Sequence, residues 1–178
     1  MEVRFVPLDL ARLDLLRMEV LALPFFEDER PLKGTAGLCD WRLCGALSKL
    51  LVGGRVTGAV EEVTLVPGRP RLPFEKLILF GQGPSEDFDL GASERVTARL
   101  LATLTGLRLR SVALSLPGRG NGRVPPGEAM RWFLQSLAES DELDEVVIVD
   151  DIEAQRAMVP VLESARRRVR VVRSASEP

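Results

Sequence analysis

The chain has 178 residues, of which 24 are basic and 26 acidic, giving a formal charge of −2, and it contains no histidine. This length suits one domain with its own apolar core, and the near-neutral charge argues against nucleic acid as the main partner. The lack of histidine excludes Ser-His, Cys-His and histidine–metal chemistry.

The N-terminal residues and the apolar runs bear on location. Arg4 and Asp9 interrupt the apolar core that a signal peptide needs. No apolar run approaches the ~20 residues of a membrane span. A cytoplasmic protein without membrane contact is therefore expected.

The first half alternates short apolar runs with helical patterns. Residues 2–7 and 18–23 predict two strands, the second closed by Pro24. Phe25 and Phe26 follow, as a hydrophobic plug or as the lining of a groove. After a charged loop at 27–35, a helix is predicted over residues 36–51, with Gly53 and Gly54 ending it. Residues 60–66 and 76–80 predict two further strands.

Two cysteines lie on the predicted helix over residues 36–51. Cys39 and Cys44 are five residues apart and hence about 140° apart around its axis, which places them badly for a mutual disulfide. They are interpreted as reduced thiols in or near the core, with a redox or metal role as the alternative.

A strand, a glycine-rich loop and a helix follow one another over residues 111–140. Residues 111–116 predict the strand, and Pro125 and Pro126 suit the first turn of the helix. Free N–H groups in such a loop, together with the positive end of the helix dipole, can bind phosphate. A plain strand-to-helix connection is the alternative. The candidate phosphate-binding residues are Gly118, Arg119, Gly120, Asn121, Gly122, Arg123 and Val124.

Acidic residues stand at the starts of two further helices. Glu86, Asp87 and Asp89 precede a helix over about residues 90–104 and are interpreted as caps rather than catalytic carboxylates. A strand at 145–149 leads into Asp150 and Asp151. The spacing of Asp150 and Glu153 predicts a capping box, with a metal or ribose site as the alternative. An arginine cluster stands at the end of the last helix, where the helix dipole favours cations, and an anionic partner is the alternative. Its members are Arg166, Arg167, Arg168, Arg170 and Arg173.

The order of elements predicts a three-layer α/β domain over residues 1–173, with a mixed, mostly parallel sheet, followed by a disordered tail at 174–178. In such sheets ligands bind beyond the carboxyl ends of the strands. We expect the 117–124 loop, residues 81–83 and the Asp150-Asp151 pair to converge there. The accessory candidates for this site are Gly34, Gly37, Gly81, Gly83, Asp150 and Asp151.

Residues 111–165 resemble the C-terminal half of a macro domain, whose corresponding loop holds the diphosphate of ADP-ribose. The first two thirds of the chain resemble the N-terminal domain of the leucyl aminopeptidase family, which shares the macro-like fold. The matching segments are VLALPFFED, GGRVTGAVEEVTLVPG and KLILFGQGPSEDFDLGASERVTARLLATL. The resemblance implies a three-layer α/β/α domain. The family's two-metal peptidase site belongs to a separate domain whose motif is not in this sequence, and Asn121 is the only asparagine.

Three functional hypotheses follow. The first is a non-catalytic interaction or regulatory domain that assembles with itself or with another protein, and it needs no cofactor and no metal. The second is a binding module in which the loop amides hold ADP-ribose or another phosphorylated nucleotide. The third is an enzyme acting on such a ligand through Asp150 or Asp151. Peptidase activity is not expected from this chain alone, and nucleic-acid contact through the arginine cluster is a minor alternative.

Overall fold

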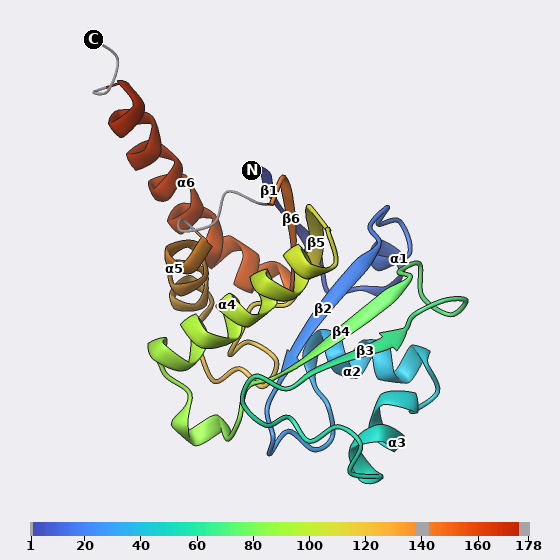
Figure 1. Cartoon of the computed structure of the whole chain (residues 1–178). Helices are drawn as coiled ribbons and strands as arrows, with labels where there is room; N and C mark the ends of the chain where they lie inside the picture. The colour runs from blue at the N-terminus through green and yellow to red at the C-terminus, as the bar shows by residue number, and fades with distance from the viewer. Residues whose placement is uncertain (1, 138–142, 175–178) are drawn as a thin grey trace.

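Our computed structural model describes the main chain over residues 2–137 and 143–174, and its side chains as far as Arg166. The strands of this part form a six-stranded sheet in the order β1-β6-β5-β2-β4-β3 (Figure 1). All neighbours run parallel except β3, which is antiparallel to β4. The predicted mixed, mostly parallel sheet is confirmed. Its strands are β1 (Glu2–Pro7), β2 (Val20–Phe25), β3 (Val63–Pro67), β4 (Lys76–Gly81), β5 (Ser111–Leu114) and β6 (Glu145–Asp150).

Helices cover both faces of the sheet, which confirms the three-layer prediction (Figure 1). One face carries α4 (Leu90–Gly106), α5 (Pro126–Leu137) and α6 (Ile152–Ser174), and the other carries α1 (Leu10–Leu13), α2 (Gly34–Arg42) and α3 (Ala46–Val52). A short 3-10 turn, Ser85–Asp87, precedes α4. No helix of the described chain combines the length and apolar character needed to cross a membrane.

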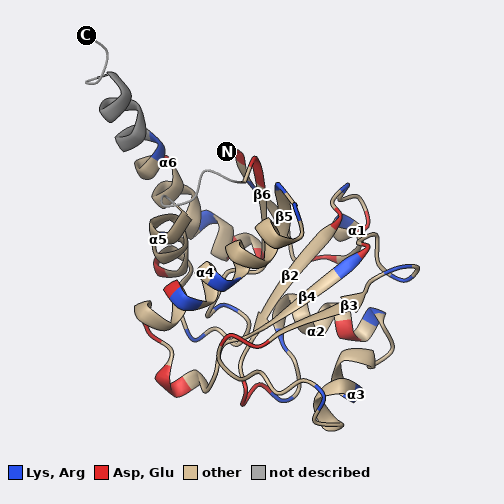
Figure 2. Ribbon diagram, in the orientation of Figure 1, with Lys and Arg blue, Asp and Glu red and all other residues tan. Residues whose placement is uncertain are grey.

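The strand β2 explains why the sheet needs cover on both sides. Val20 and Ala22 join the apolar cluster on one face, while Leu21 and Leu23 join the cluster on the other. All six residues of β2 are buried, and Figure 2 shows no charged residue on this strand. A strand buried on both faces has to be apolar throughout, which is the pattern that predicted it.

Pro24 does not close β2, contrary to the sequence prediction. The main chain of Ala22 faces β5, because its carbonyl accepts the N–H of Ser115 at 3.2 Å. Main-chain groups alternate between the two neighbouring strands along β2, so those of Pro24 face β5 as those of Ala22 do. The pairing of β2 with β5, however, already ends at Ala22. The N–H that Pro24 lacks therefore removes no ladder hydrogen bond, and β2 continues to Phe25. Phe25 and Phe26 are 1% and 0% exposed, which confirms the interpretation as a plug.

The single helix predicted over residues 36–51 is wrong, because the chain breaks it into α2 and α3. Cys44 and Gly45 adopt φ values of 56° and 76°, outside the helical range. The Asp40 carboxylate accepts the N–H groups of Leu47 at 2.8 Å and Ser48 at 3.0 Å, so a side chain of α2 caps α3. The predicted stop at Gly53 is confirmed, since α3 ends at Val52.

The break also separates the two cysteines. Both thiols are free, as expected, but only Cys39 is buried. Burial raises the pKa of the Cys39 thiol to about 12, and the neighbouring Asp40 carboxylate adds to this shift. Cys44 is exposed, so its placement in or near the core is wrong.

Later boundaries differ from prediction by a few residues. The strand β5 ends at Leu114 rather than at residue 116, and α5 begins at Pro126. The long helix α6 continues to Ser174 and projects beyond the sheet (Figure 1). Ser174, predicted as the first residue of the tail, thus belongs to α6. The side chains of residues 167–174 and the whole of 175–178 lie outside the description, so most of the arginine cluster and the rest of the predicted tail are not described.

Candidate functional site

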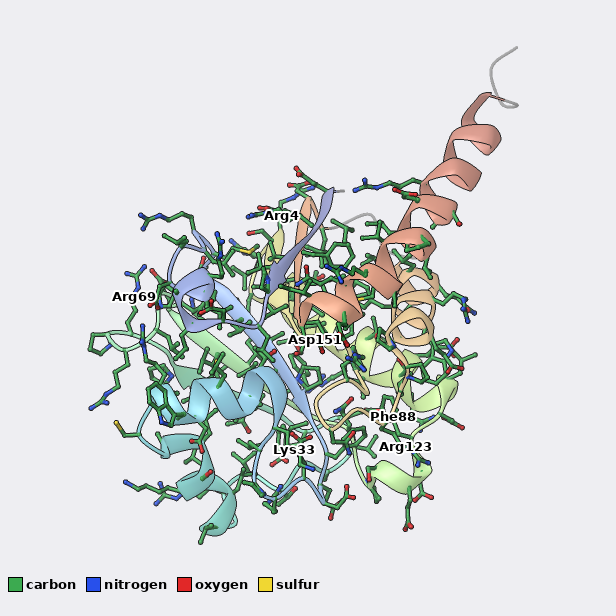
Figure 3. The ribbon with its side chains drawn as sticks, turned by 180° about the vertical axis from the view of Figure 1, so that it is seen from behind. Arg4, Lys33, Arg69, Phe88, Arg123 and Asp151 are labelled. Atoms are coloured by element: carbon green, nitrogen blue, oxygen red, sulfur yellow. The ribbon has the colours of Figure 1, made fainter. Side chains whose placement is uncertain are left out.

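Three segments that are far apart in sequence meet at the carboxyl end of the sheet. The N–H of Gly118 donates to Oε1 of Gln82 at 2.7 Å, which joins the glycine loop to the end of β4. Nε of Arg119 lies 2.8 Å from Oδ2 of Asp150, which joins the loop to the end of β6. The predicted convergence of the 117–124 loop, residues 81–83 and the Asp150-Asp151 pair is therefore confirmed. Figure 3 labels Asp151, Phe88, Arg123 and Lys33 in this region.

Most N–H groups of the glycine loop donate to acceptors within the protein. Of the seven loop amides, those of Gly120 and Asn121 have no acceptor among the described residues. The other five donate as follows: Gly118 to Gln82 Oε1, Arg119 to Leu116 O, Gly122 to Arg119 O, Arg123 to Asn121 Oδ1 and Val124 to Gly118 O. The loop is thus held largely by its own hydrogen bonds.

Arg119 is committed to a buried ion pair. Its side chain is 12% exposed, and that of Asp150 is 10% exposed. The guanidinium binds both oxygens of Asp150, with Nε to Oδ2 at 2.8 Å and Nη2 to Oδ1 at 3.2 Å. Nη1 also donates to the carbonyl of Val124 at 3.0 Å. A bidentate pair of this kind fixes both the loop and the end of β6.

The helix cap at the start of α6 differs from prediction. Oδ1 of Asp151, not Asp150, accepts the N–H of Ala154 at 2.8 Å. Asp150 is unavailable for capping because its carboxylate faces Arg119. The predicted capping box of Asp150 and Glu153 is therefore wrong by one residue, and the reason is the ion pair, which the local spacing does not reveal. The predicted cap at Asp89 is confirmed, since its Oδ1 accepts the N–H of Ala92 at 2.8 Å.

A buried carboxylate that the sequence did not single out lies against the loop. Glu29 is 3% exposed. Its Oε1 accepts the N–H of Lys33 at 2.8 Å, and its Oε2 accepts the N–H of Phe26 at 3.2 Å. A Cβ on Gly120 would lie 3.2 Å from Oε2 of Glu29. The Glu29 carboxylate thus contacts the glycine loop and ties residues 26–33 together beneath it.

The environment of Glu29 shifts its protonation. Burial raises the pKa of this carboxyl, and the N–H groups of Lys33 and Phe26 oppose the shift without cancelling it. Nothing local distinguishes Glu29 from Glu27 and Asp28 in the charged segment that precedes α2. Only its burial, which depends on the distant glycine loop, sets it apart.

The accessory glycines fall into two groups. Gly34, with φ of +53°, packs on the loop so closely that a Cβ would lie 3.2 Å from the carbonyl oxygen of Gly120. Gly37 faces the carbonyl of Leu32 instead. Gly81 and Gly83 pack against the 58–60 segment. Gly34 therefore packs on the loop, and Asp150 is joined to it through Arg119, whereas Gly81 and Gly83 belong to a segment that reaches the loop through Gln82. A ligand-binding role for any of these residues stays a prediction.

Gln82 carries an unused polar group in the same region. The residue is 2% exposed, and its Oε1 accepts the Gly118 N–H. Its Nε2 is buried and has no hydrogen-bond partner among the described residues. A buried donor without an acceptor is costly and calls for an explanation, such as a bound water or ligand. No group of three or more His, Cys, Asp or Glu residues in the described chain is placed to hold a metal ion.

Comparisons with known proteins agree with this architecture. A probable cytosol aminopeptidase from Cyanothece sp. is 28% identical over 123 residues, which are 69% of this chain and 25% of that protein. The chain thus spans about a quarter of the length of this relative. The macrodomain of Trypanosoma brucei in complex with ADP superimposes with a TM-score of 0.69 at 16% identity, covering 90% of this chain and 68% of that one.

Tomato leucine aminopeptidase superimposes with a TM-score of 0.57 at 14% identity, covering 93% of this chain and 36% of the tomato chain. These two structural likenesses establish a macrodomain-like fold. The family model for the N-terminal domain of the cytosol aminopeptidase family matches residues 22–145, which is more than half of the sequence. The chain therefore belongs to the cytosol aminopeptidase family and carries its N-terminal domain.

Proposed function

We propose that this chain is a non-catalytic interaction domain, which acts through contacts with protein rather than by binding a nucleotide. One observation carries the proposal: the glycine loop uses its donors within the fold. Five of its seven amides have protein acceptors, and Arg119 is paired with Asp150. The Glu29 carboxylate lies beside Gly120, where it would repel an approaching phosphate.

The two aspartates considered as catalytic residues also have structural roles. Asp150 pairs with Arg119, and Asp151 caps α6. The chain matches its curated relatives in their N-terminal domain, so the peptidase activity of those proteins is not proposed for it. These points support the interaction role over the enzyme hypothesis.

A second candidate function is binding of ADP-ribose or another phosphorylated nucleotide by the loop. The buried, unpaired Nε2 of Gln82 favours it, together with the unused amides of Gly120 and Asn121. A macrodomain with the same fold has been solved with ADP. For such a ligand to bind, the Glu29 carboxylate would have to move or take up a proton.

Isothermal titration calorimetry with ADP-ribose separates the two functions, on protein whose mass in solution is fixed by light scattering. We expect no saturable heat. Saturable binding would overturn the proposal. If it is seen, Gly122→Val should abolish it, since Gly122 has φ of +75° and a side chain there would strain the loop. Gly106→Ala is the matched control, because a Cβ there meets nothing within 4 Å and the residue lies at the far end of α4.

A further inference from the structure

The strand β3 is an open edge of the sheet. It is the last strand in the sheet order and pairs only with β4 among the described strands. Its central residue, Leu65, is 50% exposed. An edge of this kind presents unpaired N–H and C=O groups that another strand can join. The other edge differs, because Nη2 of Arg166 donates to the outward carbonyl of Val3 in β1 at 3.2 Å.

The hydrogen bonds that flank β3 show which main-chain groups point outward. The N–H of Gly81 donates to the carbonyl of Glu62, and the N–H of Gly68 donates to the carbonyl of Glu75. Residues 62, 64, 66 and 68 therefore face β4, since bonding alternates along an antiparallel pair. The outward groups of β3 are consequently the N–H and C=O of Val63 and Leu65 and the C=O of Pro67.

Opposite charges stand at the two ends of this edge. Glu61 precedes β3 and Arg69 follows it, and both are exposed. Figure 2 shows the basic loop at the far end of β3, and Figure 3 shows Arg69 at the surface. An antiparallel copy of the same segment would place each charge opposite its complement. The edge is therefore complementary to itself in charge.

We propose that β3 is the interface through which two copies of this chain associate, by antiparallel pairing about a two-fold axis at Leu65. Leu65 of one copy exchanges N–H to C=O hydrogen bonds with Leu65 of the other. The Val63 N–H of each copy donates to the Pro67 carbonyl of the other. The proline, which has no N–H, thus serves only as an acceptor. The proposal rests on the interaction role inferred above and names its surface and partner.

The register follows from the extent of the strand and from its charges. Centring on Leu65 pairs the whole of Val63–Pro67 and brings Glu61 opposite Arg69 twice. A shift of the axis to Thr64 would require Glu61, whose φ is +62°, to continue the ladder. A shift to Val66 would move Glu61 out of reach of Arg69. The apolar cross-strand pairs favour the Leu65 register. The Glu61 and Arg69 side chains flank the paired strands and meet across their ends, where Arg69 also lies 3.7 Å from Glu75 of its own chain.

Sedimentation velocity over a concentration series from about 1 µM to about 1 mM tests the association of the full chain. We expect a monomer–dimer equilibrium that Leu65→Pro weakens at least tenfold, because it deletes the outward N–H. The change leaves the bonds to β4 intact, since proline is tolerated where an edge strand's N–H faces solvent. Leu65→Val keeps the N–H and is the matched control. A wild-type chain that stays monomeric throughout would overturn the proposal.

Disulfide trapping provides a second test that does not depend on Leu65→Pro folding. In a Cys44→Ser background, Leu65→Cys should form a covalent dimer on oxidation, because Cα atoms of a hydrogen-bonded antiparallel pair lie about 5.5 Å apart, within disulfide reach. Val52→Cys is the control, since Val52 is 88% exposed at the end of α3, away from the edge. A dimer that persists in Leu65→Pro and is not trapped at residue 65 would contradict the β3 interface.

The two proposals fail separately. Saturable ADP-ribose binding would overturn the proposal that the chain does not act by binding a nucleotide, whether or not the β3 dimer forms. If the chain is monomeric and binds no ADP-ribose, the β3 interface is overturned. The interaction role would then require a different protein as the partner.

Discussion

The carboxyl end of the sheet and the β3 edge use their main-chain hydrogen-bonding groups in opposite ways. At the carboxyl end, the glycine loop donates most of its N–H groups to the protein, and Arg119 and Glu29 are buried beside it. At the β3 edge, the outward groups of Val63 and Leu65 have no acceptor or donor in the described chain. The first region is closed by its own side chains, and the second is open.

This difference teaches that the shape of a loop is a weaker guide to binding than the availability of its donors. A glycine loop before a helix has the outline of a phosphate site, but hydrogen bonds already made must be broken or bypassed before a ligand can use them. A free sheet edge has no such competition. Four predictions would break or sharpen the comparison.

The largest effect is expected from Arg119→Ala at the closed end. The change leaves the buried Asp150 carboxylate without its partner, which typically costs about 3–5 kcal/mol of stability. Urea unfolding followed by circular dichroism measures this loss. The double variant with Asp150→Ala should lose less than the sum of the single changes, because no unpaired charge remains. Additive losses would contradict a coupled ion pair.

Glu29→Ala should be the next most damaging change. It removes the acceptor of the Phe26 and Lys33 N–H groups beneath the loop, and we expect a loss of about 2–3 kcal/mol in the free energy of unfolding. Glu27→Ala is the matched control, since Glu27 is an exposed acid two residues away, and it should change stability little. Equal effects of the two changes would mean that Glu29 does not hold the loop.

The closed end also shows where prediction from sequence succeeds and where it stops. Apolar runs of period two and helical spacing located the strands and most helices, and the rule that parallel strands end at one edge predicted which loops meet. These features are local or follow from topology. The contacts that close the loop are not local and do not follow from the topology. The buried carboxylate of Glu29, for example, packs against Gly120, which lies some ninety positions later in the sequence.

The same limit explains the wrong boundaries. Pro24 stays in β2 only because β5 ends early on the side that Pro24 faces. Asp150 does not cap α6 because Arg119 holds it. The break between α2 and α3 had a local signal in Gly45, which lay inside the predicted helix. Two of these three outcomes thus required knowledge of a neighbour in space.

The two regions should respond oppositely to pH. Burial raises the pKa of Glu29, so its contribution to stability is fully present below its ordinary pKa of 4.5 and is lost as the pH rises through the raised value. Glu62, directly before β3, has a lowered pKa: burial raises it, but hydrogen bonds from the N–H groups of Gly58, Thr57 and Ala59 and from the Thr57 hydroxyl together outweigh the effect of burial. Its contribution is present above 4.5 and is lost as the pH falls through the lowered value.

Unfolding free energies of Glu29→Gln and Glu62→Gln, each compared with wild type over a pH series, test this opposition. The advantage of wild type over Glu29→Gln should shrink from acid to neutral pH. Its advantage over Glu62→Gln should grow over the same series. Parallel pH profiles for the two variants would show that the carboxylates do not lie in the opposite environments described.

The smallest effect is expected at the open edge, from reversing one charge. Arg69→Glu places two acidic side chains opposite each other at both ends of the proposed dimer. Because a cross-strand pair is worth about 0.2–1 kcal/mol, the dissociation constant of the dimer should rise roughly 3- to 10-fold. Sedimentation at low and high salt measures the change, which salt should reduce. Arg12→Glu, at an exposed position of α1, alters the net charge equally and should leave the dimer unchanged. Adding Glu61→Arg to Arg69→Glu should restore association, since the opposite charges face each other again. Because this double variant also restores the net charge, Arg12→Glu is the variant that separates a general charge effect from the loss of the specific pair.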